Sequence, residues 1–208
     1  MQHSNIPGTG APGVEVRPAR PDDTAAAELV FIAAAPAYTR LAGSAERARR
    51  IVGLMWSLPG HSASFEHALV AEVDGAIAGV LIGFPVRDRY RLHRALLRKS
   101  LRHLSPRRWP LLMAALPRIV LASPRPPRGA YYIGTIAIAW QARHRGVATT
   151  LGRRTEADIE ERGFRQVVAH TGTGHALARL ALEGYGFRLR RARRNGYALY
   201  VKDVAPDG

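Results

Sequence analysis

The sequence predicts a single α/β (α+β) domain in which helices flank a mixed central sheet of about six to seven strands. Three observations support this prediction. The 208 residues are a typical length for one domain, and 47% hydrophobic with 23% charged residues is a globular composition. Helical periodicities alternate with short β-branched runs along the chain, which is the pattern of a layered sheet. One dipeptide, Asp74-Gly75, separates two apolar runs and is typical of a tight hairpin.

The chain begins with a predicted strand and helix. Val14–Arg17 alternates in the manner of a short strand. We expect Asp22 and Asp23 to cap a helix that continues to Ala34, because short polar side chains accept bonds from the first free amides of a helix. Pro36 is expected to end this helix.

A second helix and a hairpin follow. Ser44 is a good cap for the second helix, and Pro59-Gly60 closes it. The runs 68–73 and 76–84 flank Asp74-Gly75, so they are expected to pair as antiparallel strands across a two-residue turn.

The segment 87–128 differs in character from the rest of the chain. It carries 12 basic residues and one acidic residue, whereas residues 1–86 have a net charge of −2 and residues 129–208 of +6. Two amphipathic basic helices are expected here, over about 90–104 and 109–121, and the prolines of 123–128 end them. We therefore interpret 87–128 as a helical insert between strands 3 and 4.

The remaining elements alternate regularly. A buried strand is expected over 131–140, and a long helix over 147–162 that ends at Gly163. A strand at 166–170, a short helix at 174–183 and two closing strands at 187–190 and 197–202 complete the prediction.

Composition excludes several classes of protein. The absence of cysteine excludes disulfides, thiolate metal sites, iron–sulfur clusters and cysteine nucleophiles. The histidines lack metal-ligand spacing, so no metal is expected. No apolar run is long enough for a membrane span, and the Gly/Pro-rich residues 1–13 resemble a disordered tail rather than a signal peptide. A cytoplasmic protein is the expectation.

The segment Arg143–Thr149 carries the clearest chemical signal. A strand ends, a turn with Gly146 follows, and a helix begins at once. The first amides of a helix lack intrahelical partners and lie at its positive end, so such a turn binds phosphate. Gly146 and Ala148 leave these amides accessible, and Arg143 and Arg145 add positive charge. The lysine of a P-loop and the three glycines of a dinucleotide fold are missing, which disfavours ATP and NAD.

This segment resembles the GNAT superfamily of acyl-CoA-dependent N-acetyltransferases. Arg143-His144-Arg145-Gly146-Val147-Ala148 fits the family's Arg/Gln-x-x-Gly-x-Gly/Ala pyrophosphate loop. His175–Phe187 is similar to the closing segment of the family, and the order of elements matches from Val14 to Lys202. The resemblance implies one GNAT-like domain over 14–208 that includes the insert 87–128.

The resemblance also implies the function and the donor site. The protein would transfer an acetyl or other acyl group from acetyl-CoA, its co-substrate, to a primary amine of a small molecule or peptide by direct attack. The backbone amide of Ile138 would polarise the thioester carbonyl. The implied donor contacts are Ile136, Ala137, Ile138, Arg143, His144, Arg145, Gly146, Val147, Ala148, Thr149 and His175.

The catalytic residues do not follow the family pattern. Leu182 stands where many members have a tyrosine that acts as the general acid, and His175 replaces an asparagine. Gly134 and Thr135 stand where a carboxylate often serves as base. By residue type, Tyr185 and His175 are the candidate catalytic residues, and His170 and Glu66 are further substitutes. A core that binds acyl-CoA without catalysis stays open.

Two interpretations of the insert 87–128 remain. In the first, its helices cover the acceptor side of the domain. In the second, its basic residues bind nucleic acid or another acidic surface. Arginines that face the pocket would repel a cationic acceptor, so we expect them to face solvent or the acceptor to be neutral or anionic. A homodimer through the exposed closing strands is also considered.

Overall fold

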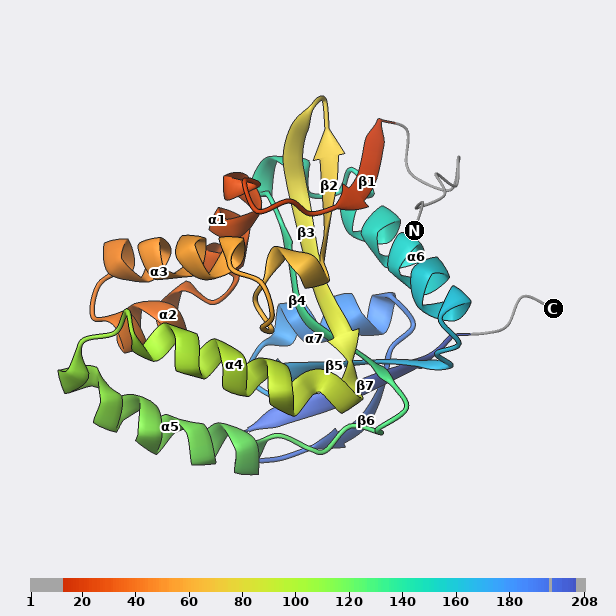
Figure 1. Ribbon diagram of the computed structural model, residues 1–208. Coiled ribbons are helices and arrows are strands. Elements are labelled where there is room, and N and C mark those ends of the chain that lie inside the picture. Colours follow the sequence, from red (N-terminus) through yellow and green to blue (C-terminus); the bar gives the residue numbers. More distant parts are fainter. Residues whose placement is uncertain (1–12, 195, 205–208) are drawn as a thin grey trace.

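The computed structural model describes residues 13–194 and 196–204, without the side chains of 115–121. Its centre is one seven-stranded sheet with the strand order β1-β2-β3-β4-β5-β7-β6 (Figure 1). The strands are β1 (Val14–Pro18), β2 (Ala68–Val73), β3 (Ala76–Pro85), β4 (Tyr131–Ile138), β5 (Gln166–Gly172), β6 (Arg188–Ala192) and β7 (Tyr197–Asp203). Strands β4 and β5 pair in parallel and the other neighbours are antiparallel, so the sheet is mixed as predicted.

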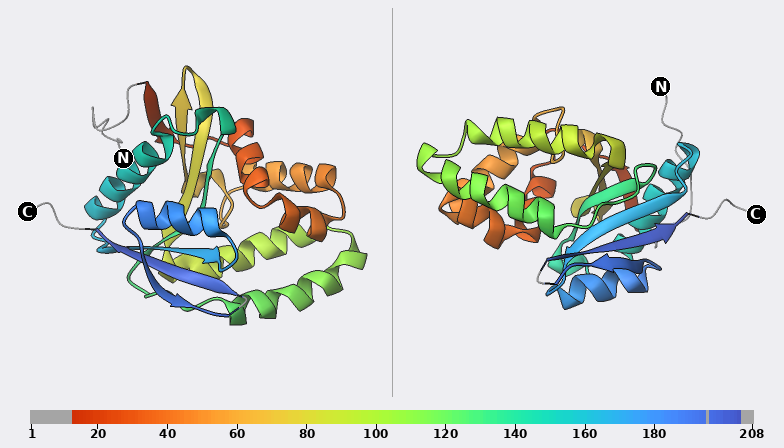
Figure 2. Two further views of the ribbon diagram at one scale, coloured as in Figure 1. Left: turned by 180° about the vertical axis from the view of Figure 1, so that it is seen from behind. Right: turned by 90° about the horizontal axis from the view of Figure 1, so that it is seen from below.

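Helices cover both faces of the sheet (Figure 2). They are α1 (Thr24–Ala33), α2 (Ala35–Ala42), α3 (Ala45–Ser57), α4 (Arg89–Leu101), α5 (Trp109–Ala122), α6 (Val147–Glu161) and α7 (Ala176–Gly184). Helix α1 packs on β3 and β4 from one face. Helix α6 crosses β1 to β4, and its Val147 and Leu151 share a buried cluster with Leu81 of β3. We call the two sides the α1 face and the α6 face.

The predicted hairpin is confirmed in detail. Val73 pairs with Ala76 across the turn, and Asp74 and Gly75 have φ values of 53° and 76°. Two consecutive left-handed residues are characteristic of a type I′ turn, and this turn matches the twist of the strands it joins.

For the first helix, the predicted end is confirmed and the predicted side-chain cap is wrong. Asp23 precedes α1 but its side chain makes no cap; it accepts two bonds of 2.8 Å from Arg17 and one of 2.7 Å from the amide of Arg20. A half-buried ion pair therefore uses the carboxylate that the sequence assigned to the helix. Helix α1 ends at Ala33, within one residue of the predicted end before Pro36. The sequence did not predict α2; Pro36 lies in its first turn, where a missing amide proton costs no hydrogen bond. Ser44 caps α3 as expected and accepts from the amide of Arg47.

The insert forms two helices between β3 and β4, as predicted. Leu92 of α4 is buried in the main core, and Leu112 of α5 packs with Phe31 of α1. Lys99 of α4 donates 2.7 Å to the carbonyl of Pro59 after α3. These contacts make the insert part of the domain's own core on the α1 face.

Among the described residues, no single helix is long and apolar enough to cross a membrane. Helices α1 and α2 reach that threshold only together, and they meet at an angle of 91°.

Candidate active site

The turn between β4 and α6 places backbone amides at a helix end. After β4, a short 3-10 turn (Trp140–Ala142) leads to His144 and Gly146, whose φ values are 63° and 76°. Gly146 is the N-cap of α6 and offers no capping side chain. The amide of Thr150 bonds the Gly146 carbonyl at 2.9 Å, so the amides of residues 147–149 precede the first bond of the helix. These amides are free to bind an anion.

The two arginines of this turn lie differently. Arg145 pairs with Asp74 of the β2–β3 turn at 3.2 Å, so a carboxylate partly neutralises its charge. The guanidinium of Arg143 lies 4.2 Å from the ring centroid of Trp140, which is 74% exposed. Both side chains are at the surface beside the helix end, where a ligand can compete for them.

Strands β4 and β5 separate beside this turn. Their pairing stops at Ile133 and Ala169, although β4 continues to Ile138 and β5 to Gly172. The amide of Ala139 donates to the carbonyl of Ala78 in β3. Because amides alternate along an antiparallel edge, those of Ile138 and Ile136 point away from β3, toward the separation. The polar edge that β5 leaves unpaired is therefore available to a ligand.

Of the two predicted catalytic residues, Tyr185 lies on the α6 face. The Tyr185 ring packs against Gly152 of α6, where an added Cβ would come within 2.7 Å of it. The hydroxyl of Tyr185 is buried with no hydrogen-bond partner among the described residues, and burial raises its pKa to about 12. His175 is exposed at the start of α7, and Leu182 packs in the cluster that Tyr185 joins.

The two further substitutes have different surroundings. Glu66 accepts a 2.6 Å bond from the amide of Gly60, so it holds the turn before β2. His170 lies one residue beyond the last pair of β4 with β5. Cross-strand partners share a face, and His170 pairs with Leu199, which belongs to the core on the α1 face. His170 thus lies where the strands separate, on the face opposite to Tyr185.

The environment of His170 fixes its tautomer. Its Nε2 is 2.8 Å from the carbonyl oxygen of Pro124. A carbonyl only accepts, so Nε2 carries the proton and Nδ1 keeps the lone pair. Burial lowers the pKa of His170, the bond to Pro124 opposes this shift, and the charge of Arg89 adds to it. The ring is therefore neutral near pH 7 and can accept a proton.

Sequence reasoning missed the groups around His170. Its ring centroid is 5.7 Å from that of Tyr132, and the guanidinium of Arg89 lies 5.5 Å from the Tyr132 ring. His93 of α4 packs edge-on against Tyr132 at 6.4 Å and bonds Ser62 at 2.8 Å. These residues come from separate elements, and no local motif links them.

The comparisons with known proteins concern the fold. No protein-family model and no curated protein sequence matches the chain. A solved acetyltransferase matches at a TM-score of 0.69 and 18% identity over 92% of this chain and 100% of its own. An N-acetyltransferase from Staphylococcus aureus Mu50 matches at 0.65 and 17% identity, over 90% of this chain and 100% of its own. A structure from Desulfovibrio desulfuricans, described as belonging to the GNAT family, matches at a TM-score of 0.52 and 20% identity, over 92% of this chain and 99% of its own. The chain has the GNAT fold.

The GNAT fold confirms the resemblance found in the sequence, including the helical insert between the third and fourth strands. At these identities the likeness shows the fold alone. Any assignment of donor-binding or catalytic residues therefore rests on the geometry of this chain itself. That geometry brings Ile138, the helix end at Gly146 and His170 to the region where β4 and β5 separate.

Proposed function

We propose that this protein is an N-acetyltransferase that uses acetyl-CoA to acetylate a primary amine of a small molecule or peptide by direct attack. The observation that carries the proposal is the separation of β4 from β5 beside the open helix end at Gly146. A strand edge and a helix end together suit an extended ligand with a pyrophosphate. A structural neighbour, the PaiA N-acetyltransferase from Thermoplasma acidophilum, was solved in complex with coenzyme A; it has a TM-score of 0.51 and 11% identity, over 91% of this chain and 98% of its own.

Donor binding falls mainly to the backbone. The amides of the α6 end would hold the pyrophosphate, and the β4 edge would bond the rest of the donor. His175, exposed at the start of α7 and next to Gly172, would flank the donor where β5 ends. The assigned residues are Ile136, Ala137, Ile138, Arg143, His144, Arg145, Gly146, Val147, Ala148, Thr149 and His175.

Acetyl transfer then needs three groups of this chain. The Ile138 amide stabilises the negative charge that develops on the carbonyl oxygen. As the nitrogen–carbon bond forms and the carbon–sulfur bond breaks, His170 accepts the amine proton through Nδ1. Tyr185 keeps its proton at neutral pH, since its pKa is raised to about 12, and we assign it to protonate the leaving thiolate from the α6 face.

Thermal unfolding with acetyl-CoA tests this proposal. Millimolar acetyl-CoA is expected to raise the melting temperature, because a ligand that binds only the folded state stabilises it. Gly146→Trp should abolish this shift by filling the space in front of the amides. Gly163→Trp is the matched control, since Gly163 lies at the other end of α6, has the same φ of 76° and has open space around it. No shift with the unaltered protein would refute the proposal.

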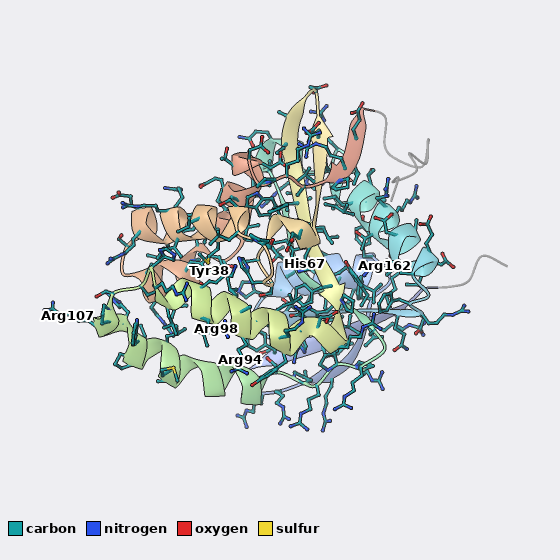
Figure 3. All side chains as sticks on the ribbon, in the orientation of Figure 1. Tyr38, His67, Arg94, Arg98, Arg107 and Arg162 are labelled. Atoms are coloured by element: carbon teal, nitrogen blue, oxygen red, sulfur yellow. The ribbon has the colours of Figure 1, made fainter. Side chains whose placement is uncertain are left out.

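An alternative is a nucleic-acid-binding module whose core binds acyl-CoA without catalysis. The exposed Arg94 and Arg98 of α4 and Arg107 before α5 favour it (Figure 3). This alternative predicts oligonucleotide affinity that falls steeply with salt, because each phosphate contact releases counterions. Affinity that is absent at physiological salt would exclude it.

Cytoplasmic location and a homodimer remain proposals. A dimer through the edge strand β6 would bring the arginines of two copies together, because all five residues of β6 are exposed and three are arginine. Such like charges oppose strand pairing. Sedimentation at several salt concentrations tests the dimer, which should form only when salt screens this repulsion.

A further inference from the structure

A cavity of about 490 Å³ lies beside the closing hairpin and has no assigned role. Leu199, only 2% exposed, forms an apolar wall together with two prolines. The complete lining is Arg125, Pro126, Pro127, Arg190, Arg191 and Leu199, so three arginines and no acidic residue line the cavity.

The cavity shares its face and its covering loop with His170. His170 pairs with Leu199, and Leu199 pairs with Arg191, so the three residues form one row across β5, β7 and β6. Pro124, which accepts the bond from His170, directly precedes Arg125 of the cavity. Figure 1 shows the segment between α5 and β4 running beside β6 and β7. The cavity therefore adjoins the proposed site of amine attack.

The charge of this region is uncompensated. In the described part of the chain, no carboxylate forms an ion pair with Arg125, Arg190 or Arg191, whereas Arg145 of the turn between β4 and α6, the proposed donor turn, pairs with Asp74. Arg89 adds a further positive charge against Tyr132 on the same face. A cationic acceptor would be repelled here. Guanidinium groups instead bind carboxylate and phosphate through paired hydrogen bonds, and an apolar wall strengthens the attraction.

We propose that the acceptor is a primary amine with a carboxylate or phosphate group, and that Arg125, Arg190 and Arg191 bind this anion. The proposal rests on the proposed acetyltransferase function. Neighbouring strands lie about 4.8 Å apart, so β5 and β6, with β7 between them, are about 10 Å apart. An amine at His170 and an anion at Arg191 are thus separated by an extended linker of several carbons.

Binding to a panel of linear amines tests the proposal. The probes are ω-amino acids with two to eight carbons, the corresponding aminoalkyl phosphates, and alkylamines of the same lengths without the anion. Calorimetry at constant ionic strength with coenzyme A present is expected to show at least tenfold tighter binding of one anionic amine than of its alkylamine. Whichever of the two sets of probes, the amino acids or the aminoalkyl phosphates, binds more tightly identifies the anion.

Variants separate the cavity from general charge. In the double variant R190Q/R191Q, the affinity for the anionic amine is expected to fall to the affinity for its alkylamine. The thermal shift with acetyl-CoA should be retained. Arg193→Gln is the matched control, because Arg193 follows β6 in the same hairpin but does not line the cavity. The proposal is overturned if no anionic amine exceeds its alkylamine, or if the preference survives in R190Q/R191Q. Failure of the acetyl-CoA shift in the unaltered protein would instead refute the proposed function.

Discussion

The proposed donor turn and the proposed acceptor face are built in different ways. The donor turn is contiguous, from Arg143 to Thr149, and presents mainly backbone amides at one helix end. The acceptor face assembles side chains from distant segments, with His170 on β5, Arg89 on α4 and Arg191 on β6. A site made of backbone depends on local conformation, which a short motif specifies. A site made of side chains depends on packing between elements, which leaves no local signal.

The two regions also differ in charge compensation. Arg145 of the donor turn pairs with Asp74, and Arg143 stacks on Trp140. The three arginines of the proposed acceptor cavity line it without an acidic residue. The same residue type therefore adds to the backbone's attraction for phosphate in one region and provides the main attraction for an anion in the other.

The largest effect is expected from His170→Gln. Turnover should fall about 100-fold, the usual contribution of a general base. The acetyl-CoA thermal shift should be unchanged, because the donor turn does not use this side chain. Turnover is measured as thiol release with an acceptor amine. His103→Gln, which replaces an exposed histidine of the insert, is the control. Equal turnover of His170→Gln and the unaltered protein would remove His170 from the reaction.

The pH profile gives a second readout of His170. The base must be unprotonated, and its pKa is lowered from 6.5. As the pH is lowered, kcat/KM should therefore stay constant past pH 6.5 and fall only at lower pH. This fall should disappear in His170→Gln, whose amide does not titrate. A fall that persists in this variant would belong to another group.

A smaller effect is expected from Gly152→Ala, which tests the packing of α6 on α7. The new Cβ would lie 2.7 Å from the Tyr185 ring, and such overpacking costs about 1–3 kcal/mol of stability. Gly53→Ala in α3 is the matched control, because it has open space and should stabilise by about 0.5–1 kcal/mol. Urea unfolding measures both changes. A stabilised Gly152→Ala variant would show that α7 adjusts freely and does not fix Tyr185.

The smallest effect is expected from Leu182→Tyr. Leu182 is half-buried in the cluster that contains Tyr185, and a hydroxyl there would add a second proton donor on the α6 face. Turnover should be unchanged or rise a few-fold, which is within reach of general acid catalysis. Steady-state thiol release measures it. A large loss of turnover at unchanged stability would mean that Leu182 itself lines the substrate pocket.

The sequence predicted most elements because their signals are local. The Asp74-Gly75 turn, the Ser44 cap and the helix start at Gly146 each depend on the conformation of a few consecutive residues. Two features that the sequence did not predict have the opposite cause. Asp23 is drawn into a half-buried ion pair with Arg17, and Pro36, which follows the end of one helix, also lies in the first turn of the next. In each case the choice between two locally acceptable roles was made elsewhere in the fold.

By itself, the sequence determined the GNAT-like order of elements, the helix end of the proposed donor turn and the basic insert. These features depend on periodicity, glycine conformations and charge, which individual residues or short runs of residues specify. Only the tertiary structure decided where the charges and proton acceptors meet. The bond from His170 to Pro124 and the row from His170 through Leu199 to Arg191 join residues that the chain separates. Sheet pairing brings them together, and its strand order is a property of the whole core.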